Sequence, residues 1–209
     1  MKLALLVLSA CVVNFAFAED IYGHIKPSRD GIGKTYQGRE ISLVMGHLGA
    51  GWLERPSRER EERTDLLLSN LPIDDASVVA DIGAGTGYFA FRLANRVRLI
   101  YAVDIQQEML DIMGKRISIG EFDNVVTVLG SEKDPSLSKE SIDLIFIVDA
   151  YHEFSYPYEM GKAMVEALKP SGKLVLIEYR AEDPEVPIKR LHKMSQAQVV
   201  KEMSEIGMK

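Results

Sequence analysis

Glycine and carboxylate residues at a strand-to-helix junction are the residues of this chain best suited to binding a cofactor. The apolar run Val78–Ala80 leads into Asp81 and then into three glycines at alternate positions, ending at Gly87. Glycine lets the backbone turn sharply or approach a ligand where a Cβ atom would clash. A helical pattern follows, and the free N–H groups at a helix start point toward whatever lies in the turn. The segment therefore predicts a loop that binds a nucleotide-like cofactor.

A second group of polar residues follows another apolar run, Ile142–Val148. It includes Asp149, Tyr151 and His152. An imidazole titrates near neutral pH and is suited to removing a proton from a reacting group. The alternative is a His that forms only local hydrogen bonds. The chain thus has candidates for binding in one segment and for acid–base chemistry in the other.

The spacing of the glycines separates two kinds of cofactor loop. A dinucleotide-binding fingerprint requires G-x-G-x-x-G, and Tyr88 stands where the third glycine would be. The pattern D-x-G-x-G-x-G instead resembles motif I of the class I S-adenosyl-L-methionine (SAM)-dependent methyltransferases. The resemblance implies SAM as the cofactor, and the alternative is a turn that is only structural. The loop residues that it implies as cofactor-binding are Asp81, Gly83, Ala84, Gly85, Thr86 and Gly87.

An acidic residue also ends the next predicted strand. Arg98–Val103 is that strand, and Asp104 follows it about 20 positions after the glycine loop. A carboxylate at this place accepts hydrogen bonds from two ribose hydroxyls. Asp is also a favoured N-cap residue, so the alternative role is to cap the predicted helix Gln106–Ile119. The family resemblance favours ribose binding and implies that Ile105 lies near the adenine.

At the adenine contact the sequence departs from the family pattern. Family members often carry a Gly-Asp pair after the third strand, and its acidic residue meets the adenine amino group. Here Gly130 is followed by Ser131 and then by Glu132. Either Ser131 forms the hydrogen bond or Glu132 takes the place of the acidic residue. Both are therefore expected among the cofactor-binding residues.

Strands and helices alternate through the elements that must position these residues. Such alternation predicts a parallel sheet with right-handed crossovers and helices on both faces. The strands are expected at 78–82, 98–103, 125–129, 142–148 and 173–179. Helices are expected after the glycine loop and at 106–119, 158–168 and 196–206, with a turn at 169–172.

The segment Leu168–Glu178 resembles the "LKPGG-strand" segment of small-molecule methyltransferases, and the whole resemblance covers residues 71–180. It implies an α/β, Rossmann-like class I methyltransferase fold with the sheet order 3-2-1-4-5. The family's sheet usually has two more strands, 6 and 7, which do not follow the predicted helix at 196–206. Either the sheet has five strands or the gene product is truncated.

Ligands of such sheets bind beyond the carboxyl ends of the strands, where the strand order reverses. That point lies between strands 1 and 4, so Asp149–Phe154 should face the glycine loop. We expect His152 to act as a base, Tyr151 to line the substrate pocket, and Asp149 to contact the methionine end of the cofactor or to orient the loop. Glu178–Arg180 would form the far wall of the pocket. The positions of His and Cys in the sequence predict no metal site.

The first residues of the chain predict a secretory signal. A basic residue precedes the apolar run Leu3–Val13, and Ala16 and Ala18 fit a cleavage site after Ala18. Lipidation at Cys11 and an uncleaved anchor are the alternatives. We expect an exported protein, periplasmic or secreted, without stable membrane insertion after cleavage. The expected divisions are a signal peptide at 1–18, an extension or lid at 19–70, a SAM-binding core at 71–180, and a linker and helix at 181–209.

Within the extension, Ser57–Asn70 is predicted to be a helix whose polar face, Arg58–Arg63, is solvated. Glycines around His47 and Trp52 indicate a loop that lies close to another surface. That loop either covers the cofactor, as extensions of this fold often do, or Trp52 packs on the helices of the sheet.

The length and charge of the chain restrict its function. Its 209 residues suffice for one α/β domain, and a net charge of −6 without a basic stripe argues against nucleic-acid binding. The resemblance to predicted bacterial methyltransferases with an Asp-Ala/Val-Tyr-His-Glu-Phe segment implies methyl transfer from SAM to an unidentified small molecule. Because SAM is made in the cytosol, export leaves a second hypothesis: a non-catalytic exported binding protein that keeps the fold and the nucleoside site. A nicotinamide-dependent oxidoreductase is a third. The sequence predicts no oligomeric state.

Overall fold

The computed structural model describes residues 21–120 and 122–208. The predicted signal peptide, with Cys11 and the cleavage site after Ala18, lies outside the described residues. Within those two ranges, no helix combines the length and the apolar character that crossing a membrane requires.

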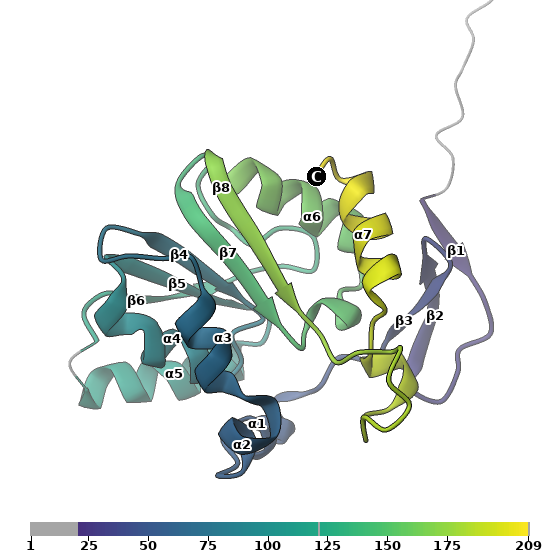
Figure 1. The fold of residues 1–209 in the computed structure, drawn as a ribbon, viewed down its shortest axis with the longest axis horizontal. Helices are drawn as coiled ribbons and strands as arrows, with labels where there is room; N and C mark the ends of the chain where they lie inside the picture. The colour runs from purple at the N-terminus through teal and green to yellow at the C-terminus, as the bar shows by residue number, and fades with distance from the viewer. Residues whose placement is uncertain (1–20, 121, 209) are drawn as a thin grey trace, which may run out of the picture.

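A five-stranded parallel sheet lies at the centre of the molecule (Figure 1). Every neighbouring pair of its strands is parallel, and their spatial order is β6-β5-β4-β7-β8. The predicted fold class and strand order, 3-2-1-4-5, are thus confirmed. The order reverses between β4 and β7, where ligands of open α/β sheets bind. The strands are β4 (Val78–Ile82), β5 (Leu99–Asp104), β6 (Val125–Leu129), β7 (Ile142–Val148) and β8 (Leu168–Ile177).

Helices cover both faces of this sheet (Figure 1). Alternate residues of a strand point to opposite faces, so Val79 of β4 packs in one apolar cluster while Ala80 packs in the other. All five residues of β4 are buried, which explains its mainly apolar sequence. The covering helices are α3 (Thr64–Asn70), α4 (Tyr88–Leu93) and α5 (Gln107–Ile119) on one face, and α6 (Pro157–Ala167) and α7 (Gln196–Glu205) on the other.

The extension contains a small antiparallel sheet that the sequence pattern did not predict. Gln37 and Gly38 both have positive φ, 51° and 92°. Two central residues with positive φ form the type I′ turn that joins hairpin strands. The elements of this part are β1 (Tyr22–His24), β2 (Gly31–Tyr36), β3 (Arg39–Ser42), η1 (His47–Gly49) and α1 (Ala50–Leu53).

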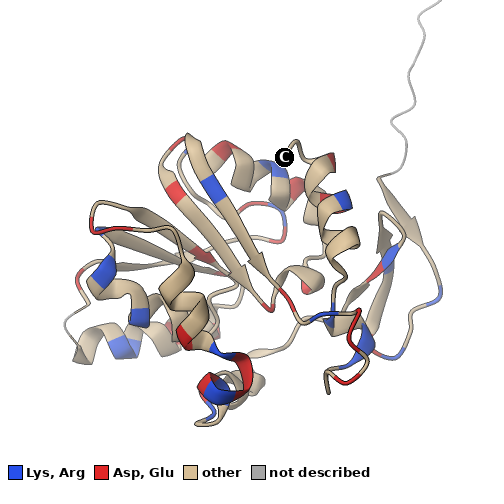
Figure 2. Cartoon of the chain, in the orientation of Figure 1, with Lys and Arg blue, Asp and Glu red and all other residues tan. Residues whose placement is uncertain are grey.

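The helix predicted at 57–70 is divided in two. α2 (Arg58–Glu62) ends where Arg63 adopts a left-handed conformation with a φ of 50°, and α3 follows. Figure 2 shows acidic and basic residues alternating on α2. Arg58 is only 4% exposed; its guanidinium lies over the Tyr88 ring and pairs with Glu62 at 2.9 Å. The prediction of a fully solvated charged face was therefore wrong.

The turn predicted at 169–172 belongs instead to strand β8. Leu168 already pairs with Ile142 of β7, and the register shifts before the regular pairing of the strand begins. Pro170 lacks the N–H that a second strand neighbour would need. It is tolerated here because β8 is the last strand of the sheet as described.

Candidate functional site

The glycine loop joins β4 to α4 at the carboxyl edge of the sheet. Gly83, Gly85 and Gly87 all have positive φ, between 55° and 79°. Residues with a Cβ atom adopt this conformation only with strain. A Cβ atom on Gly85 would also lie 2.6 Å from Leu53 Cδ1. The carbonyl of Ala84 accepts the Gly87 N–H at 2.9 Å and completes the turn.

Asp104 ends β5 with its carboxylate against this loop. Oδ2 accepts the Gly85 N–H at 2.8 Å, and Oδ1 accepts the Gln106 N–H at 2.9 Å. The N-cap position of α5 belongs to Gln106, so Asp104 is not the cap considered as its alternative role. Burial raises the pKa of Asp104. Two backbone donors fix the carboxylate, and each oxygen keeps a lone pair for a ligand.

A cavity of about 770 Å³, measured to its open mouth, lies beside these groups. Three residues of the extension, Val44, Met45 and Leu53, form part of its wall. Six of the residues predicted to bind the cofactor also line it: Gly83, Gly85, Asp104, Ile105, Ser131 and Glu132.

One side chain fastens the extension to the rim of this cavity. Gln106 Oε1 accepts the His47 N–H at 2.8 Å, and Gln106 Nε2 donates to the Met45 carbonyl at 3.0 Å. Trp52 is 45% exposed, and the Arg55 guanidinium stacks 3.5 Å from its ring centroid. The loop predicted to lie near another surface therefore meets the start of α5.

The four remaining predicted loop residues, Asp81, Ala84, Thr86 and Gly87, lie outside the cavity wall. Asp81 is buried, and its Oδ2 has no hydrogen-bond partner among the described residues. Burial raises the pKa of Asp81 to about 8. Thr86 Oγ1 donates to Glu54 Oε1 at 2.6 Å and so joins the loop to the extension. These side chains support the loop from behind.

The chain turns after β7 at Asp149, whose φ is 52°. Tyr151 is consequently buried in the core, with no exposed surface, and does not stand on a pocket wall as predicted. Asp149 borders two neighbouring cavities and not the one beside the glycine loop. Its Oδ1 has no hydrogen-bond partner in the described part of the chain, and burial raises its pKa to about 7. Glu178–Arg180 line one of these two cavities.

His152 lies in η3 (Tyr151–Glu153), and its ring is 1% exposed. Nδ1 is 2.7 Å from Glu178 Oε2, and the backbone N–H of His152 donates to Glu178 Oε1 at 3.2 Å. Burial alone lowers the pKa of His152, but its hydrogen bonds with Glu153 and Glu178 outweigh burial and raise the pKa to about 10. Glu178 was predicted only as part of a pocket wall, and the structure makes it the partner of His152.

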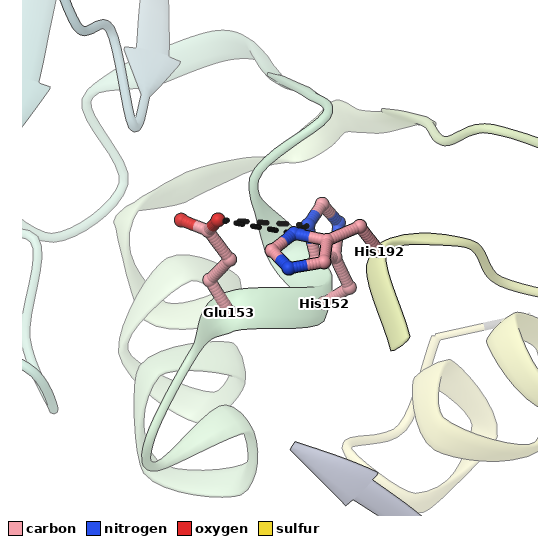
Figure 3. A group of neighbouring side chains, drawn as sticks. All are labelled: His152, Glu153 and His192. Atoms are coloured by element: carbon pink, nitrogen blue, oxygen red, sulfur yellow. Dashed lines mark hydrogen bonds and ion pairs between the residues drawn. The ribbon is translucent and has the colours of Figure 1, made fainter. Parts of the chain in front are cut away.

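His192 is the neighbour of this group that the sequence pattern missed. It comes from η4 (Arg190–His192), within the segment predicted to be a linker. Its Nδ1 lies 3.2 Å from His152 Nε2, and Glu153 Oε1 lies 3.5 Å from the same Nδ1 (Figure 3). The prediction of no metal site considered positions along the sequence. The fold brings two imidazoles and a carboxylate together from segments 40 residues apart.

Comparison with known proteins identifies the family. A family model described as a methyltransferase domain matches residues 73–207. The chain belongs to this methyltransferase family. An uncharacterised methyltransferase-like protein of Schizosaccharomyces pombe is 37% identical over 125 residues, and an uncharacterised methyltransferase of Mycobacterium bovis is 32% identical over 144 residues. These matches cover 59% and 68% of this chain but 46% and 55% of the relatives, so the chain spans about half the length of the curated relatives it matches.

A solved structure has the same fold as this chain. A SAM-dependent methyltransferase from Aquifex aeolicus matches with a TM-score of 0.70 and 21% identity. The match covers 78% of this chain and 89% of that one, and it shows the shared fold. Family membership implies SAM as the cofactor.

In this member of the methyltransferase family, the cavity beside the glycine loop and the cavity beside the His pair share a wall. Both are bordered by Val44, Met45 and Glu153. Glu153 contributes to each: Oε1 faces the two imidazoles, and Oε2 accepts the Met45 N–H at 3.1 Å. The cavity beside the glycine loop and the His group are therefore adjacent.

Proposed function

We propose that this protein transfers a methyl group from SAM to an unidentified small molecule. The observation that carries the proposal is the Asp104 carboxylate, which the Gly85 and Gln106 N–H groups hold at the edge of the cavity beside the glycine loop. In this arrangement the carboxylate would accept hydrogen bonds from the two ribose hydroxyls of SAM. The positive-φ glycines let the cofactor approach the backbone of the loop closely.

The remaining cofactor contacts are proposed from the same cavity wall. Ile105 would lie against the adenine, and Ser131 or Glu132 would accept a hydrogen bond from the adenine amino group. The segment Val44–Leu53, fastened by Gln106, would cover the bound cofactor. Each assignment is supported by a side chain or backbone group that borders the cavity.

We assign the acceptor to the adjoining cavity, which Asp149, His152 and His192 border. Methyl transfer from a sulfonium is a direct displacement: the carbon–sulfur bond breaks as the acceptor bonds to the methyl carbon, and S-adenosylhomocysteine leaves. The protein must align the two reactants and exclude water. His152 Nδ1 is engaged by Glu178. Asp149 Oδ1 accepts no hydrogen bond among the described residues and lies 4.0 Å from that nitrogen, so it is the proposed base for an acceptor proton.

Accumulation of S-adenosylhomocysteine tests the proposal. The full chain, incubated with SAM and a panel of phenols, thiols, amines and quinols, should release S-adenosylhomocysteine with one acceptor class, measured by mass spectrometry. The Asp104→Ala variant should release none above the blank. Binding of SAM without release across the panel would instead support the exported binding protein, and a folded chain that does not bind SAM would contradict both ideas.

We also propose that residues 1–18 direct export and are removed after Ala18. Expression in a bacterial host should then place the protein in the periplasm with Glu19 as its first residue, as shown by intact mass after cell fractionation. The Ala16→Asp variant should keep the mass of the full chain, because signal peptidases read small residues there. Recovery of the unaltered protein at full length from the cytosol would contradict the proposal.

A further inference from the structure

Two imidazole nitrogens and one carboxylate oxygen converge beside the cofactor cavity (Figure 3). The three separations are 3.2 Å between His152 Nε2 and His192 Nδ1, and 3.7 and 3.5 Å from these atoms to Glu153 Oε1. A point equidistant from the three atoms lies about 2.0 Å from each, which matches the roughly 2.0–2.1 Å of a bond from Zn²⁺ to a His nitrogen. We propose that these three atoms bind a divalent first-row transition-metal cation.

The two ligands on η3 are already oriented by further partners. Glu178 Oε2 accepts from His152 Nδ1 at 2.7 Å, so Nε2 is the nitrogen that faces the group, and a cation would take the place of its proton. Glu153 Oε2 accepts a hydrogen bond from the Met45 N–H, which leaves Oε1 for the cation. Metal-binding His residues almost always donate their second N–H to a carboxylate, a carbonyl or water. The contact between His152 and Glu178 is independent of the three separations, and it also supports metal binding.

The donor set decides the kind of cation. Imidazole nitrogen favours Zn²⁺, Fe²⁺, Co²⁺ or Ni²⁺, whereas Mg²⁺ and Ca²⁺ prefer an all-oxygen set. Three protein ligands leave a coordination position open, as in catalytic metal sites. His192 is 21% exposed and gives access from solvent, and Lys189 on the cavity wall is paired with Asp30 at 2.8 Å.

The open position fits a small molecule that offers an oxygen donor. A cation there would lower the pKa of a bound hydroxyl and leave a stronger nucleophile. Binding of the cation does not depend on methyl transfer; this second role rests on the proposed function.

Cobalt(II) titration tests the site directly. The full chain carrying Cys11→Ser, which removes its one thiol, should bind one equivalent of Co²⁺ and develop a visible absorption band that Zn²⁺ displaces. His192→Ala should abolish the band. Glu178→Gln should weaken Co²⁺ binding roughly 10–100-fold while the ligands remain. His24→Ala, which removes an exposed imidazole on β1, is the matched control and should behave as the parent.

The outcomes separate the proposals. An unchanged band in His192→Ala, or no binding by the parent, would overturn the metal site and leave His152 as an imidazolium held by Glu153 and Glu178. Circular dichroism of each variant checks that it is folded. SAM affinity, measured on the same samples, shows whether the cofactor site is intact, so a failed metal site is distinguishable from a failed methyltransferase.

Discussion

Replacing Asp104 with Ala is expected to weaken SAM binding by a factor of about a hundred or more. Two backbone donors hold the carboxylate in place at the cavity edge, with lone pairs left for the ribose. A hydrogen bond to a charged group contributes about 1.5–3 kcal/mol. Loss of two ribose contacts therefore corresponds to about 3–6 kcal/mol, or roughly 10²–10⁴-fold in Kd. Calorimetric titration of SAM and of S-adenosylhomocysteine measures the effect.

Asp111→Ala is the matched control for this experiment. Asp111 is an exposed carboxylate on α5 whose only partner in the described residues is the Gln107 amide, at 2.8 Å. Its removal changes net charge by the same amount and should leave the Kd for SAM unchanged. Equal affinity in Asp104→Ala and Asp111→Ala would place the cofactor elsewhere.

Replacing Arg39 with Ala should lower the free energy of unfolding by about 3–5 kcal/mol, because it leaves a buried carboxylate unpaired. Arg39 on β3 binds Glu202 on α7 through two hydrogen bonds, of 2.8 and 3.0 Å. Glu202 is completely buried, and Arg39 also donates to the His152 carbonyl at 3.0 Å. Urea denaturation at neutral pH, followed by circular dichroism, measures the loss.

Two further variants separate the effect of losing the ion pair from the effect of losing side-chain packing. Arg63→Ala removes an exposed guanidinium that pairs with Asp65 at 2.8 Å, and exposed pairs contribute about 0–1 kcal/mol. The double change Arg39→Met with Glu202→Leu removes both charges at similar volume and should restore much of the stability. If Arg39→Ala costs no more than Arg63→Ala, the pair does not stabilise the fold.

Local patterns sufficed to predict the main sheet. β6 and β7 cover the residues expected for them, because each is a continuous apolar run between polar segments. The small sheet was missed, since its strands mix Gly, Lys, Arg and Tyr and have little apolar periodicity. The one available signal was Gln37-Gly38, a pair able to form the turn of a hairpin.

The two parts of the candidate site differ in how far the sequence could predict them. The glycine loop and Asp104 depend on spacing within adjacent elements, and both border the cavity. The second part depends on backbone reversals: positive φ at Asp149 breaks the alternation of the strand, so Tyr151 enters the core. His192 reaches His152 through an irregular segment with no periodic pattern. Such a contact exists only in the folded chain.

The ion pair between Arg39 and Glu202 joins residues 163 positions apart, and this has a consequence for biosynthesis. A ribosome makes β3 before the whole central sheet and α7 after it, so Arg39 waits for its partner while the sheet is translated. A nascent chain that lacks α7 has the small sheet without this anchor. This part of the molecule can therefore complete its folding only after α7 has been made, and a chain stalled before Glu202 should expose the segment that carries β3 to proteases.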